Sequence, residues 1–322
     1  LAIADLDGDQ VQDLIVANSG AMDISVLLGN SNGTFAASQE HSAGGDAFML
    51  EAADLDADGN VDVAVLCRNG DRVSVLSGAG DGSFDGYTFL TVGNEPYSLA
   101  IGDLSGDGIL DIAVTNGGEN SVSVFSGNGD GTFSGRADYP AFEDPYAVAI
   151  LDLSGDQVPD LAITNFISAT VSVFIVEDGG FALASGEYEA DYQMISLGIA
   201  DLNGDQISDI VIGHSVSHMI SVLLGSGDGS FYSFAEYATG YYPGSVVAED
   251  LSGDGVPDLV VSNKMSDNIS VFLGNGDGSF SPRVDHESSG TPRGVALGDL
   301  DDDGNVDVAV ACASAGDVSV YL

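Results

Sequence analysis

A nine-residue acidic stretch recurs at a fixed interval, and this repeat restricts the possible folds more than any other feature of the sequence. The first copy begins at Asp5, and its first position recurs every 49 residues, in seven copies, up to Asp299. Each copy has Asp at positions one, five and nine and an oxygen-bearing side chain at position three. A fixed period without insertions indicates equivalent structural units packed against one another. We therefore predict a single repeat domain over residues 1–322, although the length alone would allow two domains.

Each unit contains the pattern of four short β-strands, and the third unit shows it best. Residues 97–101 alternate with period two, and residues 111–116 form an almost continuous apolar run, which is typical of a strand buried on both faces. Residues 121–125 predict a third strand, and the more polar segment 136–139 predicts an outer fourth strand. Four strands in 49 residues is the spacing of a propeller blade. We predict an all-β fold, a seven-bladed β-propeller of four-stranded antiparallel blades.

The two ends of the sequence fall inside blades. Seven units of 49 residues would need 343 residues, so the sequence is 21 residues short, and the shortfall corresponds to the outer strand of the last blade. The sequence begins in the first strand of a blade and has no initial Met. We expect it to be part of a longer chain. Either residues outside it complete the last blade, or that blade has three strands and an open edge.

The charge balance excludes some classes of partner. The sequence has 51 acidic and 6 basic residues, a formal net charge of -45. Nucleic-acid binding requires clustered Lys and Arg, so it is excluded, and an anionic membrane surface is disfavoured for the same reason. No apolar run approaches the ~20 residues of a membrane span, so we expect no membrane insertion. The excess of acid predicts a salty or calcium-rich exterior, that is, an extracellular or cell-surface location.

The acidic stretches have the composition of calcium loops. Ca²⁺ takes six to eight oxygen ligands, which a loop can supply from alternate side chains and one main-chain carbonyl, here that of position seven. The EF-hand uses a similar early spacing but needs a later Glu and flanking helices, which this sequence lacks. The alternative interpretation is a set of solvated acidic turns, since Asp and Gly favour turns in any case. Seven copies with Asp at the same three positions favour the calcium loops over this alternative. We predict up to seven Ca²⁺, one per blade, held by Asp5, Asp7, Asp9, Val11, Asp13, Asp54, Asp56, Asp58, Asn60, Asp62, Asp103, Ser105, Asp107, Ile109, Asp111, Asp152, Ser154, Asp156, Val158, Asp160, Asp201, Asn203, Asp205, Ile207, Asp209, Asp250, Ser252, Asp254, Val256, Asp258, Asp299, Asp301, Asp303, Asn305 and Asp307.

The seven loops are not expected to bind calcium equally. Copies two and seven have Asp at all four side-chain positions and Gly59 or Gly304 at position six, where we expect a left-handed turn. Copies four and five have Ser or Asn at position three and Gln157 or Gln206 at position six. A left-handed conformation costs Gln on the order of 1 kcal/mol. We expect occupancy to fall first in blades four and five.

Two motifs give the sequence a family resemblance. The acidic loop 250–258 and the segment 273–280 (LGNGDGSF) resemble the FG-GAP and VCBS repeats, whose best-known members are the integrin α-subunit propellers. The resemblance covers the whole chain. It implies that the acidic loop joins the first and second strands on one face of the ring, that bound calcium rigidifies the blade, and that partners bind the opposite face. Integrins carry only a few such loops, so seven copies are closer to bacterial and algal VCBS-type proteins.

The opposite face is where we expect a binding site. Scarce basic residues, two histidines and several tyrosines fall in the loops that the repeat places there, and aromatic and charged groups on a rigid scaffold are typical of a recognition surface. The alternative is that Phe48, Tyr97 and Tyr146, which are equivalent by repeat, close the mouth of the channel. The candidate ligand-binding residues are Arg68, Arg72, Tyr97, Tyr146, His214, His218, Tyr241, Tyr242, Lys264 and Arg293.

Three functions remain open at this point. The favoured one is a calcium-binding recognition or adhesion module that binds a protein or glycan. The second is a polysaccharide-cleaving enzyme, since a pair of carboxylates can be identified only in space. The third is a structural spacer in a larger secreted protein. No catalytic motif occurs, and His214 and His218 are more consistent with packing or solvation than with a metal pair.

Overall fold

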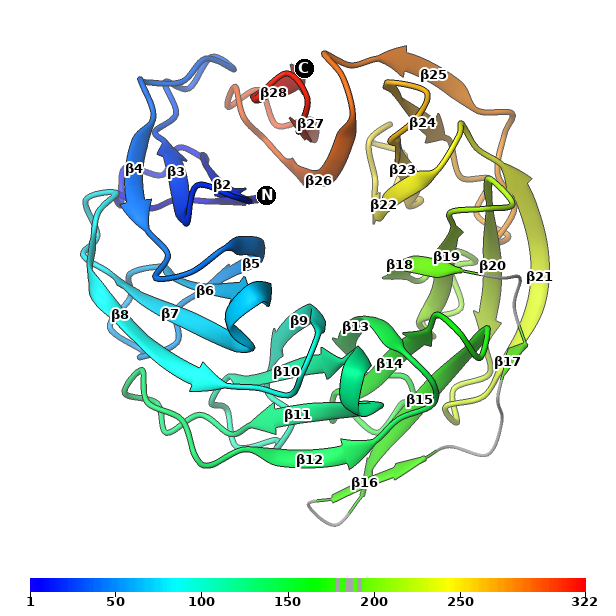
Figure 1. Cartoon of the computed structure of the whole chain (residues 1–322). Coiled ribbons are helices and arrows are strands. Elements are labelled where there is room, and N and C mark those ends of the chain that lie inside the picture. Colours follow the sequence, from blue (N-terminus) through cyan, green and yellow to red (C-terminus); the bar gives the residue numbers. More distant parts are fainter. Residues whose placement is uncertain (178–179, 184–187, 190–192) are drawn as a thin grey trace.

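The chain forms a ring of seven β-sheets around a central opening (Figure 1). The structure is a computed structural model, and it describes residues 1–177, 180–183, 188–189 and 193–322. Each sheet is one blade, built from strands that are consecutive in sequence and paired antiparallel. The first strand of each blade lies nearest the centre, and the later strands follow outward (Figure 1). The prediction of a seven-bladed β-propeller is confirmed.

The blades share one strand order. Six have four strands in radial order, with a further short strand, β17, paired to β15 in blade four, and blade seven has three. The strands are β1 (Ala2–Ala4), β2 (Asp13–Asn18), β3 (Asp23–Leu27) and β4 (Gln39–Ser42) in blade one; β5 (Ala47–Ala53), β6 (Asp62–Cys67), β7 (Arg72–Gly78) and β8 (Phe84–Thr91) in blade two; β9 (Pro96–Gly102), β10 (Asp111–Asn116), β11 (Ser121–Phe125) and β12 (Ala137–Pro140) in blade three; β13 (Pro145–Leu151), β14 (Asp160–Asn165), β15 (Thr170–Glu177), β16 (Gly180–Leu183) and β17 (Tyr188–Glu189) in blade four; β18 (Met194–Ala200), β19 (Asp209–His214), β20 (Met219–Gly225) and β21 (Phe231–Ala238) in blade five; β22 (Pro243–Glu249), β23 (Asp258–Asn263), β24 (Asn268–Phe272) and β25 (Val284–Glu287) in blade six; and β26 (Pro292–Gly298), β27 (Asp307–Cys312) and β28 (Asp317–Tyr321) in blade seven. Two 3₁₀ turns, η1 (Arg68–Gly70) and η2 (Gly117–Glu119), follow β6 and β10.

The second strand of each blade forms the core, because it is covered by both neighbouring blades. In β6, Val63 and Val65 pack in a cluster with blade one, whereas Ala64 and Leu66 pack in a cluster with blade three. Successive side chains of a strand point to opposite faces of the sheet, so a strand between two blades must be apolar at every position. This arrangement explains the continuous apolar runs in the sequence.

The ring closes through apolar contacts between blades seven and one. Leu14 and Leu27 of blade one share a cluster with Leu300 and Ala309 of blade seven. The backbone N–H of Gly33 also donates to the carbonyl of Leu300 at 3.1 Å. These contacts join blades seven and one across the two ends of the chain. No helix among the described residues is long and apolar enough to cross a bilayer.

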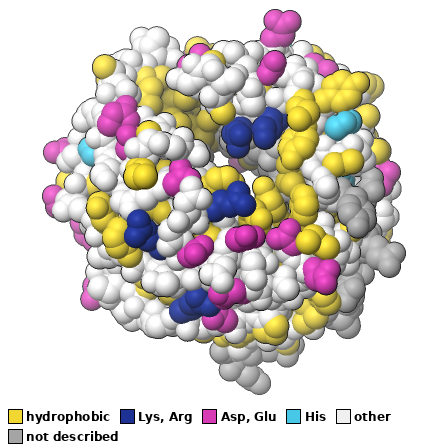
Figure 2. Space-filling view, viewed as in Figure 1, with side chains coloured by type: hydrophobic (Ala, Val, Ile, Leu, Met, Phe, Trp, Pro, Cys, Tyr) yellow, Lys and Arg dark blue, Asp and Glu magenta, His cyan; other side chains and the backbone are white. Residues whose placement is uncertain are grey.

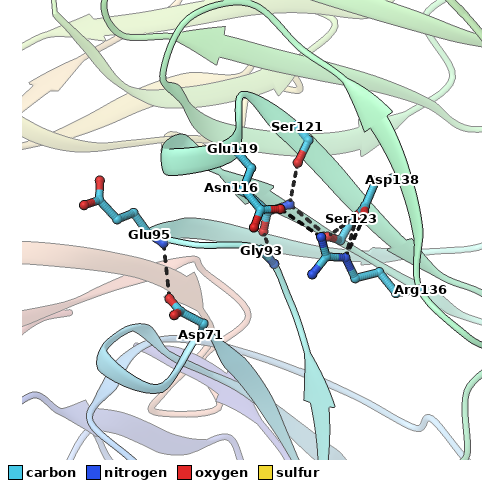
Figure 3. Close-up of polar contacts among 9 residues, drawn as sticks. All are labelled: Asp71, Gly93, Glu95, Asn116, Glu119, Ser121, Ser123, Arg136 and Asp138. Atoms are coloured by element: carbon cyan, nitrogen blue, oxygen red, sulfur yellow. Dashed lines mark hydrogen bonds and ion pairs between the residues drawn. The ribbon is translucent and has the colours of Figure 1, made fainter.

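A buried polar network ties the second, third and fourth strands of blade three together (Figure 3). Asn116, at the end of β10, donates through Nδ2 to Ser121 Oγ at 3.1 Å and to Ser123 Oγ at 2.8 Å. The Ser123 hydroxyl in turn donates to Asp138 Oδ1 on β12 at 2.8 Å. Arg136 then links Asp138 to Glu119 through ion pairs. Blades two and seven have Cys67 and Cys312 at the position of Asn116, and both thiols are free and buried.

The serine of this network gives a prediction with a built-in control. Ser123 and its repeat equivalent Ser74 are both fully buried, but Ser74 Oγ has no hydrogen-bond partner among the described residues. Ser123→Ala should lower the free energy of unfolding by about 1–3 kcal/mol, because it leaves buried polar partners unsatisfied. Ser74→Ala should change it by less than about 0.5 kcal/mol, because no bond is lost. Urea unfolding of the two variants measures both values, and equal losses would contradict the network.

A carboxyl group on the inner strand of blade two predicts a dependence of stability on pH. Glu51 accepts a hydrogen bond from the Ile101 N–H of the next blade at 2.9 Å, and blades one and three have Ala2 and Ala100 at its position. Burial raises the pKa of Glu51 from an ordinary 4.5 to about 7. Between these values the folded protein holds a proton that the unfolded chain has released, so stability falls as pH rises.

Replacing this carboxyl should remove that dependence. Glu51→Gln keeps the acceptor for Ile101 but does not titrate. When the pH rises from 5 to 8, the free energy of unfolding of the wild type should fall by up to about 3 kcal/mol more than that of the variant. The difference is smaller where water in the channel screens the charge. Urea unfolding of both proteins at the two pH values measures the difference. Parallel pH profiles would show that Glu51 is not the titrating group.

Candidate calcium loops and recognition face

Each acidic stretch forms the loop between the first and second strands of a blade, so all seven lie on one face of the ring. The backbone of each loop takes left-handed turns at positions four and six. In blade two these are Ala57 (φ 59°) and Gly59 (φ 91°), and Gln157 and Gln206 have φ of 71° and 68° at position six. The expected left-handed turn at position six is confirmed. The turn at position four was not predicted.

The carboxylate at position one is held by the backbone of its own loop. In blade two the Gly59 N–H donates to Asp54 Oδ2 at 3.0 Å, and the equivalent bond occurs in every copy at 2.7–3.0 Å. In blade six the N–H of Gly255 holds the pKa of Asp250 below its usual value. The turn at position six therefore fixes the orientation of this carboxylate in every copy, with its remaining lone pairs available to an ion.

The carboxylate at position nine has a second role that the sequence analysis did not assign. Asp62 is buried, and its Oδ2 accepts from the Leu55 N–H at 2.9 Å while its Oδ1 accepts from the Gly78 N–H at 2.8 Å. The same two bonds occur in blades one to six. In blade seven, Asp307 makes the first of these bonds, accepting from the Leu300 N–H at 2.8 Å. Burial raises the pKa of Asp62. Position nine therefore joins the loop to the end of the third strand.

The loops of blades one, two and seven fit a calcium ion. In each, three carboxylates offer oxygens that all lie within 4.8 Å of one another. Oxygens that share one Ca²⁺ at 2.3–2.6 Å can be at most about 5 Å apart, so these distances suit a common ion. In blade two, Asp54 Oδ1 is buried and has no hydrogen-bond partner among the described residues, as expected of an atom that faces a cation. The groups are Asp5, Asp7 and Asp13; Asp54, Asp56 and Asp58; and Asp299, Asp301 and Asp303.

The other four loops have a neutral side chain at position three. These are Ser105, Ser154, Asn203 and Ser252. In blade four, Ser154 Oγ is buried without a hydrogen-bond partner in the described part of the chain, so it too is available to an ion. A neutral ligand reduces the charge of the site and with it the affinity for calcium. The order in which the sites fill stays a prediction.

The loops between the second and third strands and those between blades lie on the opposite face. Figure 2 shows Lys and Arg side chains around the central opening of this face, with hydrophobic side chains between them. Several of the predicted ligand-binding residues lie in strands, not in loops: Tyr97 in β9, Tyr146 in β13 and Arg293 in β26. All three are near the start of an innermost strand, which places them at the rim of the opening.

Two of the predicted ligand-binding residues do not belong to this rim. His214 is completely buried in β19, where its Nε2 lies 2.8 Å from Ser221 Oγ, so it is a packing residue. Arg72 lies in β7, its guanidinium is 4.3 Å from the ring centroid of Phe89, and it donates to the carbonyl of Gly44. Both were assigned by repeat position, which identifies the end of a blade but not the direction of a side chain. We exclude them from the candidate surface.

A stack of rings crosses the rim from blade two to blade four. The Arg68 guanidinium lies 5.2 Å from the ring centroid of Phe48 and 4.3 Å from that of Tyr97. Tyr97 stacks on Tyr146 at 4.6 Å, and Tyr146 stacks on Phe166 at 5.7 Å. Burial raises the pKa of both tyrosines. These contacts fix the orientation of each ring through groups of the protein itself.

Blades five to seven supply the other part of the rim. Lys264 Nζ lies 5.1 Å from the ring centroid of Tyr242, whose backbone N–H donates to His218 Nδ1 at 3.1 Å. The His218 ring meets that of Tyr241 edge to face, and Tyr241 is 63% exposed. Burial lowers the pKa of Lys264, and the charge of Arg293 lowers it further. Lys264 and Arg293 also lie in neighbouring segments, since the Ser262 hydroxyl, two residues before Lys264, donates to the Arg293 carbonyl at 2.8 Å.

A hollow of about 420 Å³ opens beside Arg68, lined also by Phe48, Asp46, Asp71 and Glu95 among others. Asp46 accepts hydrogen bonds from the N–H of Gly20 and the side chain of Asn69, and Asp71 accepts from the Glu95 N–H (Figure 3). These two carboxylates hold neighbouring loops in place. We therefore base no catalytic assignment on the hollow.

Comparison with protein families identifies the repeat. The model of the FG-GAP-like repeat matches residues 5–65, 54–114, 103–163, 201–261 and 250–310, which is most of the chain. The chain belongs to the FG-GAP-like repeat family. Each match begins at position one of an acidic loop and ends in the second strand of the next blade, so the FG-GAP-like signal follows the loops described above. In a separate comparison, no curated protein matched the chain.

Solved structures with the same ring are varied in function. A putative 6-phosphogluconolactonase from Bacteroides uniformis is 16% identical, with a TM-score of 0.72 over 95% of this FG-GAP-like chain and 90% of that one. BBS1N, solved in complex with ARL6DN, is 10% identical, with a TM-score of 0.71 over 99% of this chain and 90% of that one. A streptogramin B lyase is 15% identical, with a TM-score of 0.66 over 99% and 92%. At such low identity these likenesses show the propeller fold alone.

Proposed function

We propose that this protein is a calcium-stabilised extracellular recognition and adhesion module, whose protein or glycan partner binds the face opposite the acidic loops. The observation that carries the proposal is that the candidate metal ligands lie on one face of the ring, whereas the aromatic and basic side chains lie on the other. Seven loops with oxygen ligands lie on one face. The rim of the other face carries ordered rings and Arg68, Lys264 and Arg293, which are half of the six basic residues in the sequence.

Calcium has a structural role in this proposal. The ligand loops are separated from the rim by the length of a strand, so an ion there does not contact the partner. It joins the first and second strands of a blade by binding the converging carboxylates of the loop between them. In blades one, two and seven, with the best-formed sites, it would hold the rings of the opposite face on a stiffer scaffold.

The rim has properties that suit recognition. Its rings are stacked on one another and on a guanidinium, so binding them costs little conformational entropy. Aromatic and Arg side chains are also the residues that contribute most to binding energy at protein interfaces. The BBS1N propeller was solved in complex with ARL6DN, which supports the idea that a propeller of this shape can take a protein partner.

The extracellular location is part of the proposal. FG-GAP-like repeats are typical of extracellular proteins. Calcium is abundant outside cells, so loops of modest affinity would be filled there. A net charge of -45 is also better tolerated where divalent ions and salt screen it.

The test is a binding screen with rim variants. The protein, kept in calcium, is applied to a glycan array and to a display library of extracellular proteins. A variant with Arg68→Gln, Tyr97→Ala and Arg293→Gln should lose the binding seen with the wild type. The control is Arg283→Gln, which removes an arginine paired with Asp285 on outer strand β25. Binding that the rim variant retains would contradict the proposal, as would the absence of any binder.

A further inference from the structure

The basic residues at the rim differ in how their charge is balanced. Among the described residues, the ion pairs involve Arg136 and Arg283, which lie away from the opening. Arg68 has no ion pair in the described part of the chain, but it lies close to Asp144 and lines a hollow with Asp46, Asp71 and Glu95. Its charge is therefore partly balanced by carboxylates of the same face.

Lys264 and Arg293 have no such balance. Neither forms an ion pair among the described residues, and the charge that acts most on Lys264 is the like charge of Arg293. The segments that carry them are joined, since the Ser262 hydroxyl, two residues before Lys264, donates to the Arg293 carbonyl at 2.8 Å. The Tyr242 ring lies under the ammonium group, and the Lys264 N–H donates to the Tyr242 carbonyl at 2.9 Å.

Among the described residues, no carboxylate forms an ion pair with Lys264 or Arg293, so this part of the rim carries two unpaired positive charges. Like charges at short range repel, and Lys264 is also half-buried, which adds a desolvation cost. Both costs are offset when an anion lies between the two groups and accepts hydrogen bonds from them.

We propose that Lys264 and Arg293 form an anion site at the mouth of the channel, and that its ligand is a single Asp or Glu carboxylate of a protein partner. This inference rests on the proposed function and gives the partner its chemistry. The ammonium of Lys264 and the exposed guanidinium of Arg293 would both donate to the carboxylate. The exposed ring of Tyr241 would cover the apolar part of the inserted side chain.

The charges around the site favour a partner with one isolated carboxylate. At physiological salt the Debye length is about 8 Å, so an incoming group responds mainly to the charges nearest to it. Beyond the pair, the same face presents Asp46, Asp71, Glu95 and Asp144. A polyanionic glycan, with charge at regular intervals, would meet these carboxylates. A peptide can bring one charge between neutral residues.

The test uses a small probe that carries this group. The protein is labelled with 3-fluorotyrosine, kept in calcium, and titrated with N-acetyl-aspartate methylamide while ¹⁹F spectra are recorded. Tyr242→Phe assigns the signal of the tyrosine below Lys264. We expect a saturable shift of this signal with the aspartate probe. The neutral asparagine counterpart should produce none.

Matched variants show where the probe binds. Lys264→Gln and Arg293→Gln should each weaken binding at least about fivefold, and the double variant should abolish it. Arg283→Gln, which removes an arginine that lies just before outer strand β25 and pairs with Asp285, should leave it unchanged. Equal shifts from the asparagine probe, or a titration that persists in the double variant, would overturn the anion site. A shift with glucuronate but not with the aspartate probe would overturn the assignment to a protein side chain.

This outcome can be separated from that of the proposed function. If a partner from the binding screen binds the Lys264→Gln, Arg293→Gln double variant as well as the wild type, the anion site is wrong while the recognition face stands. If binding is lost in the double variant but retained in Lys264→Arg, which keeps the positive charge, the charge at the site is what the partner requires.

Discussion

Removing calcium is expected to lower the melting temperature by on the order of 15 °C or more. A site filled at 100 times its dissociation constant stabilises the folded state by about 2.7 kcal/mol. The three loops with converging carboxylates would together contribute about 8 kcal/mol, which is comparable with the whole stability of an ordinary domain. Without the ions, the clustered carboxylates also repel one another. Thermal unfolding followed by circular dichroism, in calcium at about 100 times the dissociation constant and in chelator, measures the shift.

Two controls separate bound calcium from general screening. The ionic strength must be matched with NaCl, because a chain of charge -45 gains stability from any salt. Magnesium at the same concentration should restore only part of the stability, since it prefers fewer protein ligands and retains its waters. An unchanged melting temperature in chelator, or full recovery with NaCl alone, would show that the loops are acidic turns without a structural ion.

The architecture could be predicted because one period determines it. A step of 49 residues fixes the blade, and the period-two alternation within it fixes which side chains face each neighbour. β10 illustrates this: its predicted bounds, residues 111–116, are those of the strand, and every residue in it is buried. Such a strand has two blades to pack against, so the sequence pattern and the environment agree at each position.

The candidate sites were predictable only in part, because a repeat position does not give the direction or the partners of a side chain. His214 shares its position with Asn116 and, like it, points into the blade to bond a serine of the third strand. The position-nine carboxylates were assigned to metal from spacing alone. Their bonds to N–H groups of residues such as Gly78, 16 positions later, depend on the hairpin that brings the third strand back.

Arg293 and Lys264 also show that a position in the repeat does not identify the neighbours of a side chain. Nothing in their spacing of 29 residues indicates that they are neighbours. They meet because one follows the second strand of blade six and the other begins the first strand of blade seven. Contacts between blades can be derived from the sequence only when the order of the blades in the ring is known. That no carboxylate among the described residues pairs with these two cations can be seen only from the positions of the side chains.

The position-nine carboxylate should be the most costly side chain of the loop to remove. Asp62→Ala leaves the buried N–H groups of Leu55 and Gly78 without an acceptor. Each orphaned donor costs about 1–3 kcal/mol, so the free energy of unfolding should fall by about 4 kcal/mol. Asp62→Asn is the matched variant, because it keeps one of the two acceptor oxygens, and it should cost about half as much. Urea unfolding in chelator measures both losses without a contribution from calcium.

A comparison with position three separates the two roles of the loop. Asp56 is a predicted calcium ligand whose carboxylate accepts one exposed hydrogen bond, from the Asp58 N–H. Asp56→Ala should therefore destabilise the protein in calcium and have almost no effect in chelator, whereas the loss in Asp62→Ala should persist in both. If the Asp62→Ala loss disappears in chelator, position nine acts only through the ion. If it persists, the loop has its shape before calcium binds, and the ion stabilises a blade that the buried carboxylate has already closed.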